Sequence, residues 1–145
     1  MNRVDFYLPA SADDREVFTC RLIEKAYNER LTVWLWTDNA KQLVHYDQLL
    51  WVFKVNSFVP HDVISDDLIS PAVVSDLPHV YLSTKLDIDH AKQVGVGCVV
   101  NLTQDVIPLE FDRIADIIDP DHVEAGRKRF AHYKQLDTKL HYHGL

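Results

Sequence analysis

The chain has 145 residues, of which 47% are apolar and 26% charged, and its formal net charge at pH 7 is −7. This length suits one domain with one core, and no apolar run reaches the roughly 20 residues of a membrane-spanning helix. The acidic balance argues against direct DNA binding, which depends on Lys and Arg side chains releasing counterions from phosphates. Because the first residues lack the uninterrupted apolar stretch of a secretory signal, we expect one cytoplasmic domain over residues 1–145.

The first half of the chain alternates between strand and helix patterns. Residues 4–8 form a short apolar strand, and apolar residues at three- and four-residue spacing then predict a helix over 11–30. Residues 31–36, rich in β-branched and aromatic side chains, predict a second strand. The helix-capping types at 37–39 begin a second helix that is expected to end near residue 51.

The second half continues the alternation after an irregular stretch. Residues 62–78, with Asp, Ser and Pro throughout, predict a loop that has room for a short strand or turn. Strands are expected over 79–83, 97–102 and 114–118, and a final helix over 119–136. The predicted fold is therefore a three-layer α/β/α domain around a mostly parallel sheet of about five strands, Rossmann-like in class.

Nucleotide, metal and catalytic motifs are missing from the sequence. Its 4 glycines form neither a phosphate-binding loop nor a GxGxxG turn, and Asp13 and Asp14 would repel a pyrophosphate after the first strand. The closest histidine group is His132, His141 and His143, but His141 and His143 form a lone HxH without further zinc-type ligands, so we expect solvated histidines. Cys20 and Cys98 are expected to be small core residues. No cofactor, metal or catalytic residue is predicted. A small hydrolase or transferase using unplaced Asp and His residues stays open as the alternative.

The most informative segment runs from residue 51 to residue 61. It places Trp51, Phe53 and Phe58 beside Pro60, with no group suited to bond-making chemistry. Large aromatic side chains of this kind anchor protein interfaces, where Trp is among the favoured hot-spot residues. The same aromatics could instead close the core beneath them. Both interpretations, a docking surface and a core cap, follow from these residues alone.

A second segment concentrates positive charge near the end of the acidic chain. The cations gather within thirteen positions, with Asp137 as the opposing acid: Arg127, Lys128, Arg129, Lys134 and Lys139. On a helix, residues 127, 130, 131 and 134 share one face. From these residues alone, the pattern is typical of a solvated cationic helix end, which the helix dipole favours.

Three segments in order resemble the chi subunit family of bacterial DNA polymerase III. They are Phe6-Tyr7-Leu8, then Leu50-Trp51 followed by Ser57-Phe58-Val59-Pro60-His61, and finally Arg127-Lys128-Arg129-Phe130-Ala131-His132-Tyr133. Trp51 with the 57–61 run is the specific part of the resemblance. The resemblance extends over nearly the whole chain and implies a non-catalytic accessory subunit of the clamp-loader assembly.

The resemblance implies two partner surfaces. The first binds the psi subunit through Trp51, Phe58, Val59 and Pro60, and we add Phe53 from its position. A helicase-like protein is expected to compete with psi for this surface in some lineages. Through psi, the chain is expected to join the clamp loader.

The second implied surface binds the acidic, Phe-ending tail of single-stranded-DNA-binding protein. The matching positions are Arg127, Phe130 and Tyr133, and Lys134 is placed to assist Arg127 on the same helix face. A guanidinium can bind a terminal carboxylate bidentately while apolar groups take the ring. Since Val123 stands where the family has a basic residue, tail affinity is expected to be lower here, with Lys128, Arg129 or Lys139 compensating by steering.

Overall fold

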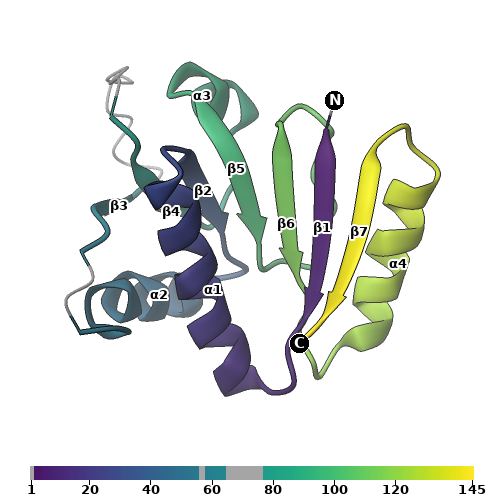
Figure 1. Ribbon diagram of the computed structural model, residues 1–145, viewed down its shortest axis with the longest axis horizontal. Coiled ribbons are helices and arrows are strands. Elements are labelled where there is room, and N and C mark those ends of the chain that lie inside the picture. Colours follow the sequence, from purple (N-terminus) through teal and green to yellow (C-terminus); the bar gives the residue numbers. More distant parts are fainter. Residues whose placement is uncertain (1, 56–57, 65–76) are drawn as a thin grey trace.

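The structure, a computed structural model that describes residues 2–55, 58–64 and 77–145, has one parallel sheet of seven strands. The strand order is β3-β4-β2-β5-β6-β1-β7 (Figure 1), and every pair within it is parallel. The strands are β1 (Arg3–Leu8), β2 (Thr32–Trp36), β3 (His61–Val63), β4 (Val80–Ser83), β5 (Val96–Asn101), β6 (Arg113–Ile117) and β7 (Lys139–Gly144).

Helices cover both faces of the sheet and give the predicted three layers. The helices are α1 (Ala12–Asn28), α2 (Ala40–Val52), α3 (Ile88–Gln93) and α4 (Val123–Lys134). Buried side chains of α1 and α2 share one apolar core with the sheet, including Ile23 and Leu50. Ala91 of α3 and Tyr133 of α4 belong to the core on the other face. Ser11 and Asn39 are the N-caps of α1 and α2, and the side-chain oxygen of each accepts a backbone hydrogen bond from the first turn of its helix.

The sheet has two more strands than the sequence predicted, one at each edge. β3 is short and partly exposed, so its three residues carry little apolar signal. β7 is polar, and its alternation of Lys, His and Tyr had suggested a solvated tail. His143 is not simply solvated: its ring stacks on Tyr7 and its Nε2 lies 2.9 Å from Oδ1 of Asp5. Although burial opposes the effect, hydrogen bonds from Arg3 and His143 lower the pKa of Asp5.

Two helix predictions also need correction. The short helix α3 was not predicted, because six residues with one buried apolar side chain give no clear period. The last helix begins at Val123 rather than near Asp119, since Asp119 accepts hydrogen bonds from the backbone of Asp121 and His122 and so shapes a turn before α4. The prediction over 62–78, a loop with room for a short strand or turn, agrees with the three-residue strand β3 at its start, and residues 65–76 lie outside the described residues.

Cys20 and Cys98 are both free and buried in the α1 side of the core, as predicted. Burial raises the pKa of the Cys20 thiol to about 12 and that of Cys98 to about 11. Because the thiolate is the reactive form, we expect the native protein at about pH 8 to resist iodoacetamide. Mass spectrometry should find both cysteines alkylated after unfolding in urea, and rapid labelling of the native chain would contradict their burial.

Candidate docking surfaces

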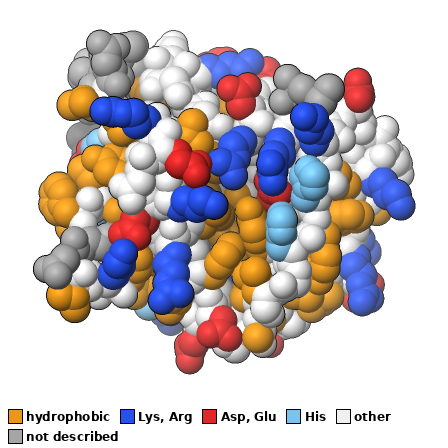
Figure 2. Space-filling model, in the orientation of Figure 1, with side chains coloured by type: hydrophobic (Ala, Val, Ile, Leu, Met, Phe, Trp, Pro, Cys, Tyr) orange, Lys and Arg blue, Asp and Glu red, His pale blue; other side chains and the backbone are white. Residues whose placement is uncertain are grey.

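Exposed apolar side chains cluster where α2 ends and the chain turns toward β3. We call Trp51, Val52, Val55 and Phe58 the aromatic surface. Trp51 is 48% exposed and Phe58 70%, and their ring centroids lie 5.7 Å apart. Figure 2 shows hydrophobic side chains gathered on the left-hand flank of the molecule, over α2 and the segment leading to β3. The residues of the aromatic surface thus lie outside the core, although large apolar side chains gain most from burial.

Three residues predicted to contact the same partner lie deeper. Val59 is 1% exposed and belongs to the core shared with α1 and α2. Phe53 is half-buried and packs against that core, and Pro60 is half-buried. The predicted contact residues are therefore not equally available to a partner. Val59 is buried beneath the aromatic surface, while Trp51 and Phe58 present their rings outward.

His61 is a residue of this site whose role the sequence did not indicate. Its side chain is 0% exposed, and Nδ1 lies 2.7 Å from the carbonyl oxygen of Val59. Nε2 lies 2.9 Å from the carbonyl oxygen of Asp47 on α2 and 3.1 Å from Oδ1 of the same residue. The ring also packs against Trp51 at a centroid distance of 4.3 Å. The signal available in the sequence was its place directly after Pro60, in a segment rich in large apolar side chains.

The predicted cationic face of α4 is present in part. Arg127, Ala131 and Lys134 are exposed along one stripe of the helix, which we call the α4 surface. Arg127 forms an ion pair with Glu124 one turn earlier. Glu124 was not among the predicted site residues, although its i,i+3 spacing to Arg127 indicates such a pair. A carboxylate ligand of Arg127 would have to displace or share this contact.

The two aromatic residues of α4 point into the protein. Phe130 is partly buried and meets Phe6 edge to face at 5.3 Å. Tyr133 is fully buried, accepts a hydrogen bond from the backbone N–H of Ile107 at 2.6 Å, and lies 3.2 Å from its carbonyl oxygen. Burial raises the pKa of Tyr133 to about 12. The prediction that Tyr133 contacts the tail peptide is therefore corrected: its side chain packs beneath α4 and is not accessible to a ligand.

Arg129 is the clearest departure from the predicted surface cations. It is 4% exposed and forms a bidentate ion pair with Asp116 of β6, with N–O distances of 2.7 and 2.9 Å. Its remaining nitrogen donates to Gln104, and Asn101 lies within 3.4 Å of the same carboxylate. Arg129 therefore compensates a buried acid, and it has no exposed charge with which to steer an acidic tail.

Another arginine fills the crevice where parallel sheets commonly bind ligands. The helices that follow β1 and β6 leave on opposite faces, so the crevice lies beyond the carboxyl ends of these neighbouring strands. Arg15 of α1 is buried there, and its Nη2 donates to the carbonyl oxygens of Ile117 at 2.6 Å and Leu102 at 3.2 Å. A side chain of the protein itself thus satisfies the carbonyl groups at this position.

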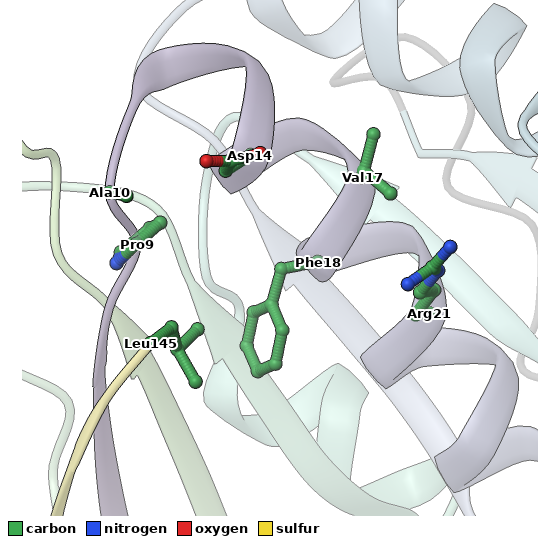
Figure 3. Close-up of a pocket in the computed structure, with 7 residues that line it drawn as sticks. All are labelled: Pro9, Ala10, Asp14, Val17, Phe18, Arg21 and Leu145. Carbon is green, nitrogen blue, oxygen red and sulfur yellow. The ribbon is translucent and has the colours of Figure 1, made fainter.

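A small open hollow of about 210 Å³ lies between α1 and the last residue of the chain (Figure 3). The Phe18 ring projects from α1 toward Leu145, with Val17 and Arg21 beyond it. The hollow is mainly apolar, and its lining residues include neither a histidine nor a cysteine: Pro9, Ala10, Asp14, Val17, Phe18, Arg21 and Leu145. The hollow therefore lacks the paired nucleophile and base that the alternative function, a small hydrolase or transferase using Asp and His residues, would require.

The model of the family described as "DNA polymerase III chi subunit, HolC" matches residues 1–141. The chain belongs to the DNA polymerase III chi subunit family. Among characterised proteins, the DNA polymerase III subunit chi of Pseudomonas aeruginosa is 29% identical over 152 aligned positions, covering 100% of this chain and 98% of that protein. Both comparisons agree with the resemblance carried by the 51–61 and 127–133 segments.

Membership in the chi subunit family makes this chain an accessory subunit of DNA polymerase III with a part in DNA replication. Within the described residues, no helix is both long enough and apolar enough to cross a membrane. The two surfaces of this chi-family chain lie near opposite edges of the sheet, the aromatic surface beside β3 and α4 beside β1 and β7 (Figure 1).

Proposed function

We propose that this chi-family chain is a non-catalytic connector that binds psi through the aromatic surface and the tail of single-stranded-DNA-binding protein through the α4 surface. The observation that carries the proposal is the exposure of Trp51 and Phe58, whose rings lie side by side. Cytoplasmic placement, clamp-loader attachment through psi and competition by a helicase-like protein belong to the same proposal.

The aromatic surface suits a folded partner with an apolar face. Val52 and Val55, which are 73% and 84% exposed, extend the apolar area beyond the two rings. Lys54 forms an ion pair with Glu24 of α1, with 3.3 Å between Nζ and Oε1, and this pair places charge at the rim of the aromatic surface. An apolar centre with a polar rim is the usual anatomy of a protein interface. We assign this surface to psi, with Trp51 and Phe58 as the anchors.

The α4 surface suits a peptide that ends in a carboxylate. Arg127 and Lys134 lie two turns apart on one exposed stripe and bring two cations to an otherwise acidic chain. Phe130 follows Arg127 by three residues and is only partly buried, so we assign its remaining exposed part the contact with an aromatic side chain. We assign the carboxylate to Arg127, with Lys134 steering the acidic residues before it.

The separation of the two surfaces along the sheet supports binding of both partners at once. Four strands, β4, β2, β5 and β6, lie between β3 and β1 in the sheet order. A partner bound on one surface therefore leaves the other open, and two linked contacts raise the effective concentration of each partner near the other. Size-exclusion chromatography with psi and a fluorescent tail peptide should give one ternary complex. Mutual exclusion of the two ligands would contradict the connector.

We expect Arg127→Ala to weaken binding of an acidic, Phe-ending tail peptide by about tenfold or more, because it removes the bidentate donor for the terminal carboxylate. Isothermal titration calorimetry at low salt measures this loss. Lys128→Ala is the matched control, since Lys128 is also exposed but lies on another face of α4. Equal effects of the two substitutions would indicate general charge attraction in place of a carboxylate site.

A further inference from the structure

His61 occupies a position in which both of its ring nitrogens face oxygen atoms that only accept hydrogen bonds. Nδ1 meets the carbonyl oxygen of Val59 at 2.7 Å, and Nε2 meets that of Asp47 at 2.9 Å. The side chain is fully buried, so water cannot replace either contact. A neutral imidazole has one N–H and would turn its lone pair toward one of the two carbonyl groups.

The imidazolium form removes this conflict, because both of its nitrogens donate. Its charge has a partner, since Oδ1 of Asp47 lies 3.1 Å from Nε2. Among the described side chains, that of Asp47 on α2 is the charged group placed against the ring. The nearby Asp62 of β3 pairs with His79 at 2.7 Å, and Lys54 pairs with Glu24.

The ring also joins the parts of the aromatic surface. Asp47 lies one turn before Trp51 on α2, and Val59 directly follows Phe58. Trp51 packs on the His61 ring at 4.3 Å, with an interplanar angle of 41°, where a cation is attracted to the indole face. His61 thus links the end of α2 to the segment that presents Phe58.

We infer that His61 is a pH-sensitive positioning residue of the aromatic surface: its doubly protonated ring fixes Trp51 and Phe58 in the arrangement that binds a partner. Loss of one proton leaves a carbonyl oxygen facing a lone pair, and the 58–60 segment shifts away from α2. Affinity for the partner then falls as pH rises. The effect on affinity depends on the proposed binding of psi at this surface, whereas the protonation and the ring arrangement do not.

The first test needs no partner. Long-range ¹H–¹⁵N NMR of the imidazole rings, assigned with His61→Gln, should show protons on both nitrogens of His61 at about pH 5, where a histidine ordinarily carries its charge. The Trp51 indole and Phe58 ring signals should shift with the same midpoint when His61 loses its proton. A neutral, single-tautomer pattern at about pH 5, or loss of the proton without any change at Trp51 and Phe58, would overturn the inference.

The second test measures psi affinity between about pH 5 and 8, the range in which histidine charge ordinarily changes. Wild-type affinity should fall with rising pH, and His61→Gln should bind about tenfold more weakly at low pH without that dependence, since both N–H donors of Gln lie on one nitrogen and do not reproduce donation from two separate ring nitrogens. His45→Gln, an exposed histidine of α2, is the control. Equal pH dependence of wild type and His61→Gln overturns the inference, whereas absence of psi binding at every pH refutes the proposed function and leaves the NMR result to decide on His61.

Discussion

Trp51→Ala is expected to abolish co-purification with psi, and a direct titration should show a loss of about 30-fold or more in affinity. The indole is half-exposed, contacts Phe58 at 5.7 Å and rests on His61 at 4.3 Å, so its removal takes away both the largest anchor and the support of the second. Phe58→Ala should cause a smaller loss, since that ring is 70% exposed and has fewer contacts to organise.

Two controls separate this result from misfolding. Tyr142→Ala removes an aromatic side chain of β7 that is 54% exposed, similar to Trp51, but lies at the other edge of the sheet. It should leave psi affinity unchanged. Trp51→Ala should keep wild-type affinity for the tail peptide at the α4 surface. If Trp51→Ala still eluted with psi at wild-type affinity, the assignment of the aromatic surface would be wrong.

Arg129→Met should be the most destabilising single substitution considered for this protein, with a loss of about 3–5 kcal/mol in the free energy of unfolding. It leaves the Asp116 carboxylate buried without its bidentate partner, although Asn101 stays within hydrogen-bonding reach. Urea denaturation followed by circular dichroism measures the loss. The double variant Asp116→Leu/Arg129→Met should recover the larger part of it, because no uncompensated charge then remains.

The pH dependence of Arg129→Met gives a second check. Burial raises the pKa of Asp116, and the hydrogen bonds and charge of Arg129 oppose that rise in the native protein. Without Arg129, only the charge of Arg15 and the hydrogen bond from Asn101 oppose the rise, so the folded variant holds the proton more tightly than the unfolded chain does. A carboxyl of this kind favours folding at low pH and loses that contribution as pH rises. The deficit of Arg129→Met should therefore narrow as pH falls, and a deficit independent of pH would contradict a buried charge as its cause.

Local sequence patterns predicted the strands correctly where the spacing of apolar residues along the chain matches their burial. The five predicted strands correspond to β1, β2, β4, β5 and β6, all inside the sheet, where near-continuous apolar runs mark burial on both faces. The edge strand β7 was not predicted, and β3 was foreseen only as a loop with room for a short strand, because an edge needs little apolar surface and these two strands are polar or short. Their pairing depends on neighbours distant in sequence, such as Asp5 beside His141 in the register of β1 and β7.

The sequence by itself determined the fold class, the two segments of interest and the chi-family resemblance, since these depend on periodicity and on short runs of residue types. Tertiary structure decided which side chains of those segments are available. Both Arg127 and Arg129 are cations on one helix, yet Arg129 turns to a buried carboxylate thirteen residues earlier in the chain and Arg127 stays exposed. Likewise Phe58 and Val59 are adjacent, but the direction of the backbone sends one outward and the other into the core. Exposure depends on contacts between distant residues, which no local pattern records.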